Sequence, residues 1–118
     1  MNKYIYVAGA MSSPSCITFL DNVRKGQRVA LKILLMGNHP FCPFLDFQYF
    51  LQLRDGEEIT LEQIRNYSMA WLRKCDMVFL VPGYEKSEGT MAEIKEAMEL
   101  GIPIAESWQT MATYWKFP

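Results

Sequence analysis

The stretch that decides the fold spans residues 76–104 and reads DMVFLVPGYEKSEGTMAEIKEAMELGIPI. Its first part is an unbroken apolar run, which is typical of a strand buried on both faces of a parallel sheet. Pro82 and Gly83 stop that strand. A helix is predicted over about 88–100, with Gly101 as its C-terminal stop. The residues IPIA that follow predict a last short strand, so this stretch forms a parallel β-α-β unit.

The same alternation extends outward to both ends of the chain. The other predicted elements are a strand at 3–8, a helix at 21–36 capped by Asp21, a strand at 39–44, a short aromatic helix at 45–53, a helix at 60–74 capped by Thr60, and a C-terminal helix capped by Ser107. With 118 residues, the chain is expected to form one domain, residues 1–118. The prediction is a three-layer α/β domain with a parallel sheet.

Periodicity predicts which helix faces are buried. In the helix at 88–100, Met91, Ile94 and Met98 are expected at the centre of the buried stripe, with Glu93 at its margin. In the helix at 21–36, the predicted buried face is formed by Val23, Gln27, Ala30, Leu31, Leu34 and Leu35.

Composition excludes several function classes. The net charge is −1 and Lys and Arg form no block, so the electrostatic footprint of a duplex-binding protein is missing. Three cysteines and one histidine provide neither a disulfide framework nor a zinc site, and no metal or cofactor is predicted. No apolar run approaches the roughly 18 residues of a membrane span. We expect a soluble cytoplasmic protein.

Two loops follow strand ends with the composition of a binding site, at residues 9–15 and 82–90. In an open parallel sheet, ligands bind beyond the carboxyl ends of the strands. The second loop leads into a helix N-terminus, where free amides favour an anion such as phosphate. Ser87 could add its hydroxyl, and Gly89 would let a ligand approach the backbone. Ser87 as a plain helix cap is the alternative interpretation.

Glu93 has two interpretations. A carboxylate at the margin of the buried stripe, at the mouth of the sheet, would be partly desolvated and could act as a nucleophile or base. Periodicity alone also allows an ordinary surface acid.

A resemblance favours the first interpretation. The segments YVAGAMSS, NVRKGQRVALKILLMGNHPFCP and LRKCDMVFLVPGYEKSEGTMAEIKEAMELGIPI resemble the nucleoside 2-deoxyribosyltransferase-like superfamily. Closest in style are its small phage and bacterial members, which include nucleoside 5′-monophosphate N-glycosidases. The likeness covers nearly the whole chain, and its most specific part is a strand followed by PG-x₃-S-x-G-x₃-E and a helix. It implies a doubly wound fold of the Rossmann or flavodoxin-like type.

The resemblance also implies roles for individual residues. Glu93 matches the glutamate that attacks the anomeric carbon of the sugar, and Tyr6 matches the tyrosine that holds this nucleophile in place. Gly9 matches the glycine that lets the sugar or phosphate come near the backbone. Asn22 matches an asparagine of many small relatives, although a helix-capping role is equally consistent. Ser87 matches the serine that binds the 5′-phosphate in the nucleotide hydrolases, where the transferases tend to carry an aspartate.

The chain departs from the superfamily pattern at Ser68. Relatives carry an acidic residue there, near the departing base. Asp46, Asp55 and Glu58 are candidates to replace it.

The favoured function is therefore hydrolysis of the N-glycosidic bond of a (deoxy)nucleoside 5′-monophosphate. One alternative is a nucleoside 2-deoxyribosyltransferase. The other is a non-catalytic nucleotide-binding or sensing protein, and the absence of an acid at Ser68 favours this second alternative. The expected partner is a small nucleoside or nucleotide rather than a nucleic acid polymer or a membrane. The resemblance further implies a homodimer or homotetramer, and the hydrophobic aromatic tail at 108–117 is the predicted contact.

Overall fold

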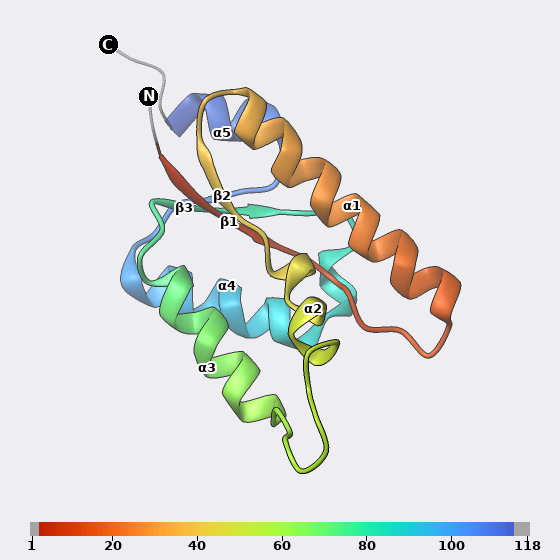
Figure 1. Ribbon diagram of the computed structural model, residues 1–118. Helices are drawn as coiled ribbons and strands as arrows, with labels where there is room; N and C mark the ends of the chain where they lie inside the picture. Colours follow the sequence, from red (N-terminus) through yellow and green to blue (C-terminus); the bar gives the residue numbers. More distant parts are fainter. Residues whose placement is uncertain (1–2, 115–118) are drawn as a thin grey trace.

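The computed structural model describes residues 3–114 and contains a parallel sheet between two layers of helices (Figure 1). The strands are β1 (Tyr4–Ala8), β2 (His39–Phe41), β3 (Met77–Leu80) and β4 (Ile104–Ala105). They are hydrogen-bonded in the order β2-β1-β3-β4, and every pair is parallel. The chain therefore winds from β1 to one edge and then back to the other side of β1, as in doubly wound Rossmann or flavodoxin-like folds. The predicted fold class is confirmed.

Helices cover both faces of this sheet. The helices are α1 (Cys16–Leu35), α2 (Phe47–Phe50), α3 (Leu61–Leu72), α4 (Glu88–Leu100) and α5 (Trp108–Tyr114), with short 3₁₀ turns η1 (Pro43–Leu45) and η2 (Tyr84–Lys86). Figure 1 shows α1 and α5 on one face and α3 and α4 on the other. Among residues 3–114, no helix is long and apolar enough to cross a bilayer.

The side chains of β1 alternate between two cores. Ile5 and Val7 pack in the core under α1 and α5, whereas Tyr6 and Ala8 pack in the core under α3 and α4. This alternation is the ordinary consequence of the pleat. It also directs the polar hydroxyl of Tyr6 toward α4, the helix that carries Glu93.

The predicted start of the first helix is wrong. α1 begins at Cys16, because the Ser15 hydroxyl accepts a hydrogen bond from the Thr18 amide at 3.3 Å and caps the helix there. Asp21 is not the cap. It lies inside α1 and pairs with Arg24 at 2.7 Å.

The predicted buried face of α1 is only partly right. Val23 and Ala30 are buried, but Leu31, Leu34 and Leu35 are exposed. The helix is rotated relative to the predicted orientation, so that Gly26 and Ile33 are buried in place of the three leucines. A Cβ on Gly26 would come within 2.3 Å of the Phe44 ring, so this glycine makes room for an aromatic side chain.

The bounds of α4 are as predicted, and Gly101 ends it in the left-handed conformation at φ 72°. Its predicted buried stripe is wrong for Met91 and Met98, which are 48% and 69% exposed, whereas Ile94 is partly buried and packs against the core as predicted. The buried residues are the smaller Thr90 and Ala97. Small side chains let the axis of α4 approach the sheet. With Thr90 and Ala97 facing the sheet in place of the two methionines, α4 is rotated relative to the predicted orientation, and Glu93 turns inward.

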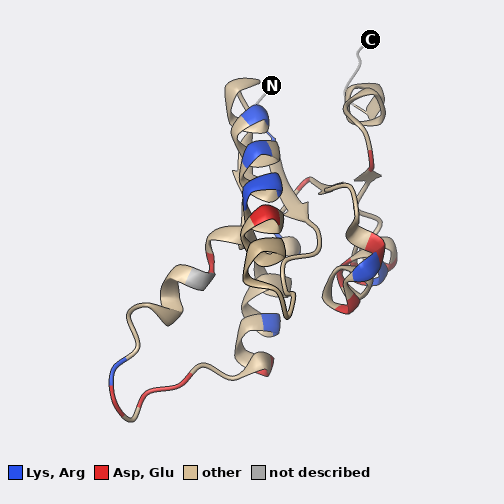
Figure 2. Cartoon of the chain, turned by 90° about the vertical axis from the view of Figure 1, so that its right-hand side faces the viewer, with Lys and Arg blue, Asp and Glu red and all other residues tan. Residues whose placement is uncertain are grey.

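The segment between β2 and α3 is less regular than predicted. The strand at 39–44 is limited to β2, and the helix at 45–53 is reduced to one turn of α2 after η1. Exposed acidic residues occupy the loop from α2 to α3 (Figure 2). Thr60 caps α3 in a reciprocal capping box with Gln63, as predicted in part. Of the aromatic tail at 108–117, residues 115–117 lie outside the described part of the chain.

Candidate active site

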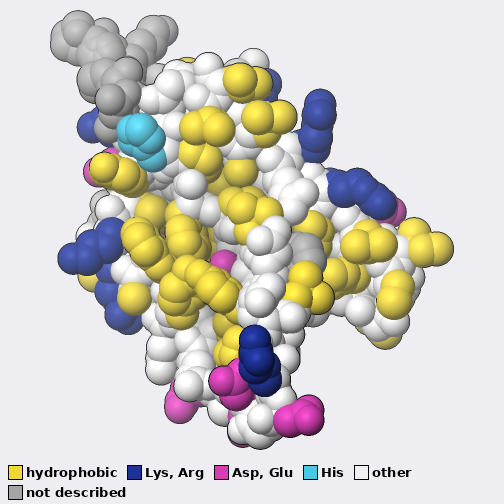
Figure 3. Space-filling model, viewed as in Figure 1, with side chains coloured by type: hydrophobic (Ala, Val, Ile, Leu, Met, Phe, Trp, Pro, Cys, Tyr) yellow, Lys and Arg dark blue, Asp and Glu magenta, His cyan; other side chains and the backbone are white. Residues whose placement is uncertain are grey.

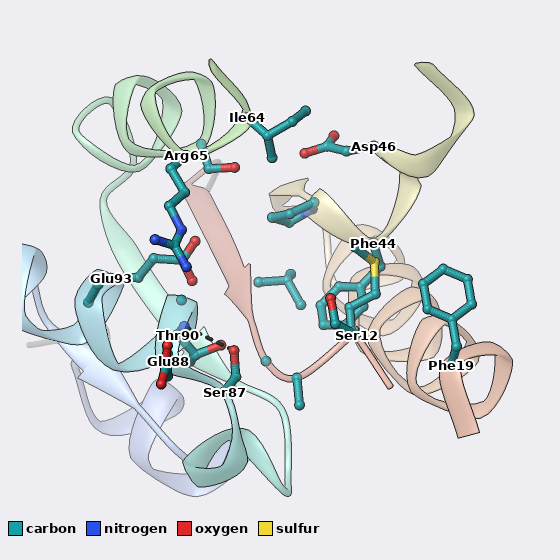
Figure 4. Close-up of a pocket in the computed structure, with 18 of the residues that line it drawn as sticks. Ser12, Phe19, Phe44, Asp46, Ile64, Arg65, Ser87, Glu88, Thr90 and Glu93 are labelled. Atoms are coloured by element: carbon teal, nitrogen blue, oxygen red, sulfur yellow. Dashed lines mark hydrogen bonds between the residues drawn. The ribbon is translucent and has the colours of Figure 1, made fainter. Parts of the chain in front are cut away.

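A cavity of about 1010 Å³ opens at the carboxyl end of β1 (Figure 4). The loops that leave β1 and β3 there run in opposite directions, so the cavity lies at the switch point of strand order. Its wall is formed by the segment after β1, the turn after β2, one side of α3 and the first turns of α4. Both loops singled out from the sequence contribute to it.

Tyr6 and Glu93 meet in this cavity region. The Tyr6 hydroxyl donates a hydrogen bond to Glu93 Oε2. Tyr6 is fully buried in the core under α3 and α4, so its ring is held firmly. The contact joins a strand residue to a helix residue 87 positions later, and it fixes the direction of the carboxylate.

The environment of Glu93 favours its neutral form. Burial raises the pKa of the Glu93 carboxyl to about 7, the hydrogen bond from Tyr6 opposes that increase, and the negative charge of Asp46 adds to it. Burial and the neighbouring Glu93 also raise the pKa of Tyr6, so this hydroxyl stays protonated and remains a donor. A carboxylate whose pKa lies near neutrality in a cavity is suited to act as a nucleophile or base.

Ser87 and Gly89 lie in the turn that enters α4, and both line the cavity. Ser87 is a helix cap, because its Oγ accepts a hydrogen bond from the Thr90 amide at 3.1 Å. The capping interpretation is therefore correct. A hydroxyl that accepts one hydrogen bond still has its own proton to donate. The first amides of α4 also have no carbonyl partner within the helix, so this turn offers hydrogen-bond donors to an anion.

Gly9 lines the cavity, and the structure gives a packing reason for it. A Cβ there would lie 2.8 Å from Val81 Cβ and 3.1 Å from Phe44 Cζ. Asn22 does not line the cavity. Its amide donates at 3.3 Å to the carbonyl of Met11, a residue that does, so Asn22 holds the loop rather than a ligand. It does not cap the helix either, because α1 already begins at Cys16.

The structure separates the three acidic residues considered as replacements at Ser68. Asp46 lines the cavity and is only 7% exposed, whereas Asp55 and Glu58 lie on the exposed loop of Figure 2. Burial raises the pKa of the Asp46 carboxyl to about 6. Ser68 also lines the cavity, and it acts on Tyr6, whose pKa it lowers slightly against the larger effects of burial and Glu93.

The sequence did not reveal the basic side chains of the site. Arg65 of α3 and Lys86 of η2 line the cavity among the described residues. Figure 4 shows Arg65 reaching from α3 into the space above the first turn of α4. Helical periodicity places Arg65 near Ser68 on one side of α3, but only the docking of α3 over the sheet end turns that side toward the cavity.

The remaining wall is largely apolar, with Phe19, Phe50, Leu51, Ile64 and Met69 among its residues. Beside it, hydrophobic side chains gather over β2 and α3 (Figure 3). There the Phe41 ring stacks on Tyr6 at 5.5 Å and on Trp71 at 5.2 Å between centroids. This stack supports Tyr6 from the side away from the sheet centre.

The three cysteines form no disulfide. Cys16, Cys42 and Cys75 are all free thiols. Burial raises the pKa of Cys42 to about 11 and that of Cys75 to about 12, so neither is poised as a thiolate. Within residues 3–114 there is no group of three or more His, Cys, Asp or Glu side chains arranged to hold a metal ion.

Residues 3–107 match the model of a family described as "Domain of unknown function (DUF7768)". No curated protein matches the chain.

Proposed function

The chain belongs to the DUF7768 family, and we propose that it is a hydrolase that cleaves the N-glycosidic bond of a (deoxy)nucleoside 5′-monophosphate. The observation that carries this proposal is the buried contact between Tyr6 of the core and Glu93, which lines a switch-point cavity beside a helix N-terminus. The resemblance of the sequence to the nucleoside 2-deoxyribosyltransferase-like superfamily agrees with it. The burial and the hydrogen bond of Tyr6 and Glu93 thus favour the same two side chains as the resemblance does.

Glu93 is the proposed nucleophile. In its ionised form it attacks the anomeric carbon, the bond to the base breaks, and a glycosyl ester of Glu93 forms. Water then cleaves the ester and gives the sugar phosphate. This is the two-step chemistry of retaining glycoside cleavage. The hydrogen bond from Tyr6 orients one carboxylate oxygen, which leaves the other free for the attack.

The α4 turn is the proposed phosphate site. The Ser87 hydroxyl, the amides at the start of α4 and the positive end of the helix dipole favour an anion. Arg65 and Lys86 add positive charge to the same cavity, and they offset the negative charge of Glu88 at its rim. The apolar wall across from this turn is suited to a planar base, since most small-molecule sites combine apolar walls with a few polar groups.

The proposal extends to the location and the oligomeric state of the protein. Three free thiols support a reducing compartment such as the cytoplasm. A homodimer or homotetramer remains the assembly implied by the resemblance. Trp108, the first residue of the aromatic tail, packs on Phe79 at 4.3 Å, so it is partly occupied within its own chain.

The test is incubation of the purified protein with a panel of ribo- and deoxyribonucleoside 5′-monophosphates, followed by chromatography of the products. We expect free base and sugar phosphate from at least one nucleotide, and loss of that activity in Glu93→Gln. Glu99→Gln is the matched control, because Glu99 lies on the same helix but is exposed. Equal base release by wild type and Glu93→Gln would remove Glu93 from the mechanism.

The same assay separates the alternatives. When a deoxynucleoside and a second free base are supplied in place of the monophosphate, a transferase forms the exchanged nucleoside, whereas a hydrolase does not. If nucleotides raise the melting temperature of both wild type and Glu93→Gln without any base release, the protein is a nucleotide-binding protein and the hydrolase proposal fails.

A further inference from the structure

The proposed reaction leaves one chemical requirement unassigned. A base that departs from the anomeric carbon takes the bonding electron pair with it, and proton donation to a base nitrogen makes that departure easier. Tyr6 is bound to Glu93, and Ser68 has no acidic proton at neutral pH. Besides Glu93, Asp46 is the buried carboxyl among the described residues that line the cavity, whereas Glu88 is exposed.

We infer that Asp46 is the general acid that protonates the departing base, an inference that rests on the proposed function. Asp46 follows η1 and lines the same cavity as Glu93. It enters the cavity from the side opposite to Ser87 (Figure 4). A nucleotide with its phosphate at Ser87 and its sugar at Glu93 therefore extends its base toward Asp46.

The fold holds Asp46 in a place that favours its protonated form more than water does. The residue is 7% exposed, and its amide donates at 2.9 Å to the Pro43 carbonyl, which fixes the turn that carries it. Burial raises the pKa of its carboxyl to about 6. Retaining glycosidases use two carboxyl groups in this way, one as nucleophile and one as acid and then base.

The groups around Asp46 come from every neighbouring element. Its charge acts on Glu93 of α4, Tyr6 of β1, Tyr67 of α3 and the thiol of Cys42. Arg65 and Lys86 are the cations of the cavity wall.

Between about pH 6 and pH 7, Asp46 and Glu93 together hold one proton, and because the pKa of Glu93 is the higher of the two, that proton resides mainly on Glu93. The reactive arrangement, with Asp46 protonated and Glu93 ionised, is the less populated form of the same one-proton state.

Protons and electrons balance over the two steps of the reaction. Glu93 forms its ester as the bond between the anomeric carbon and the base nitrogen breaks, and Asp46 gives its proton to the base. The Asp46 carboxylate then takes a proton from water as the water oxygen attacks the anomeric carbon. The ester breaks, Glu93 returns as a carboxylate and Asp46 returns as an acid.

The experiment compares Asp46→Asn with wild type on two substrates. One is the nucleoside 5′-monophosphate that wild type cleaves best. The other is 4-nitrophenyl 2-deoxyribose 5-phosphate, whose leaving group departs without a proton. We expect kcat on the nucleotide to fall by about 10²- to 10⁴-fold with little change in KM, and release of nitrophenolate to stay within a few-fold of wild type. Asp55→Asn, on the exposed loop, is the matched control and should resemble wild type on both substrates.

The outcomes distinguish the two levels of the proposal. If wild type cleaves the nucleotide and Asp46→Asn cleaves it equally well, or if the variant loses both substrates alike, the role of Asp46 is refuted and the hydrolase remains. If wild type cleaves neither substrate, the hydrolase itself is refuted.

If Asp46→Asn does not fold, wild type alone supplies the test. Its kcat/KM for the nucleotide should decline as pH rises past about 7, and that decline should be absent for the nitrophenyl substrate. The same decline with both substrates overturns the assignment.

Discussion

Replacement of Glu93 by Gln should stabilise the protein at alkaline pH while it removes activity. Burial raises the pKa of Glu93 from 4.5 to about 7, so the folded state holds its proton more tightly than the unfolded chain does. A group of this kind lowers stability as pH rises from about 4.5 to 7, since deprotonation is easier after unfolding. Each tenfold difference in proton affinity corresponds to about 1.4 kcal/mol. The ionised carboxylate therefore costs the folded protein about 3 kcal/mol at pH 8.

Gln removes that cost and keeps an oxygen that accepts the hydrogen bond from Tyr6. Urea unfolding followed by tryptophan fluorescence, at pH 4 and pH 8, measures the effect. The gain of Glu93→Gln over wild type should be larger at pH 8 than at pH 4 by about 3 kcal/mol, and melting at pH 8 should occur about 10 °C higher.

Glu99→Gln serves as the control, because that exposed carboxylate shares the helix but not the cavity. It should show no comparable gain that depends on pH. A Glu93→Gln variant whose stability relative to wild type is the same at both pH values would refute the reasoning, because Glu93 would then be as well solvated as a surface acid.

Three further predictions concern single residues. Gly26→Ala should lower the free energy of unfolding by about 1–3 kcal/mol, since the new methyl group collides with the Phe44 ring; helix propensity alone would predict a gain of about 1 kcal/mol, so a more stable variant in urea unfolding contradicts the packing. Tyr6→Phe should shift the acidic limb of the pH–activity profile to higher pH, because the hydrogen bond that lowers the pKa of Glu93 is lost; an unmoved limb contradicts it. Ser87→Ala should raise KM for a nucleoside 5′-monophosphate by about tenfold or more, because a hydrogen bond to a charged group contributes about 1.5–3 kcal/mol, and leave KM for the free nucleoside unchanged; equal increases in both contradict the phosphate site.

The control for Ser87→Ala is the loss of another helix cap. Ser15→Ala removes the cap of α1, whose Oγ accepts from the Thr18 amide, and Ser15 does not line the cavity. Both variants should lose about 1 kcal/mol of stability. Only Ser87→Ala should change the KM for the monophosphate.

Features encoded in neighbouring residues were predictable. The bounds of α4 follow from the serine before it and the glycine after it, and the capping box of α3 follows from Thr60 and Gln63. The parallel sheet follows from the alternation of strands and helices, and the position of the cavity follows from the loops that leave the strand ends. Glu93 and Tyr6 were both singled out, and the structure brings them into contact.

Features that depend on packing between distant segments were not predictable. Met91 and Met98 are the larger apolar residues of α4, so periodicity buries them, yet the sheet accepts the smaller Thr90 and Ala97. A glycine inside α1 costs helix stability, and only the Phe44 ring, supplied by the turn after β2, explains why Gly26 stands there.

The position of Asp46 has the same origin. Its sequence neighbourhood predicts a helix, but a 3₁₀ turn folds back over the sheet end and buries the carboxyl. Three acidic residues were equivalent in the sequence, and only the tertiary structure separates Asp46 from Asp55 and Glu58.

Covalent trapping tests the central claim most directly. Wild type would be incubated with a nucleoside 5′-monophosphate whose sugar carries fluorine at C2, which slows hydrolysis of a glycosyl ester, and then digested and analysed by mass spectrometry. We expect a peptide that contains Glu93 and is heavier by one fluorinated sugar phosphate. An adduct on any other residue, or release of the base with no adduct at Glu93, would contradict it.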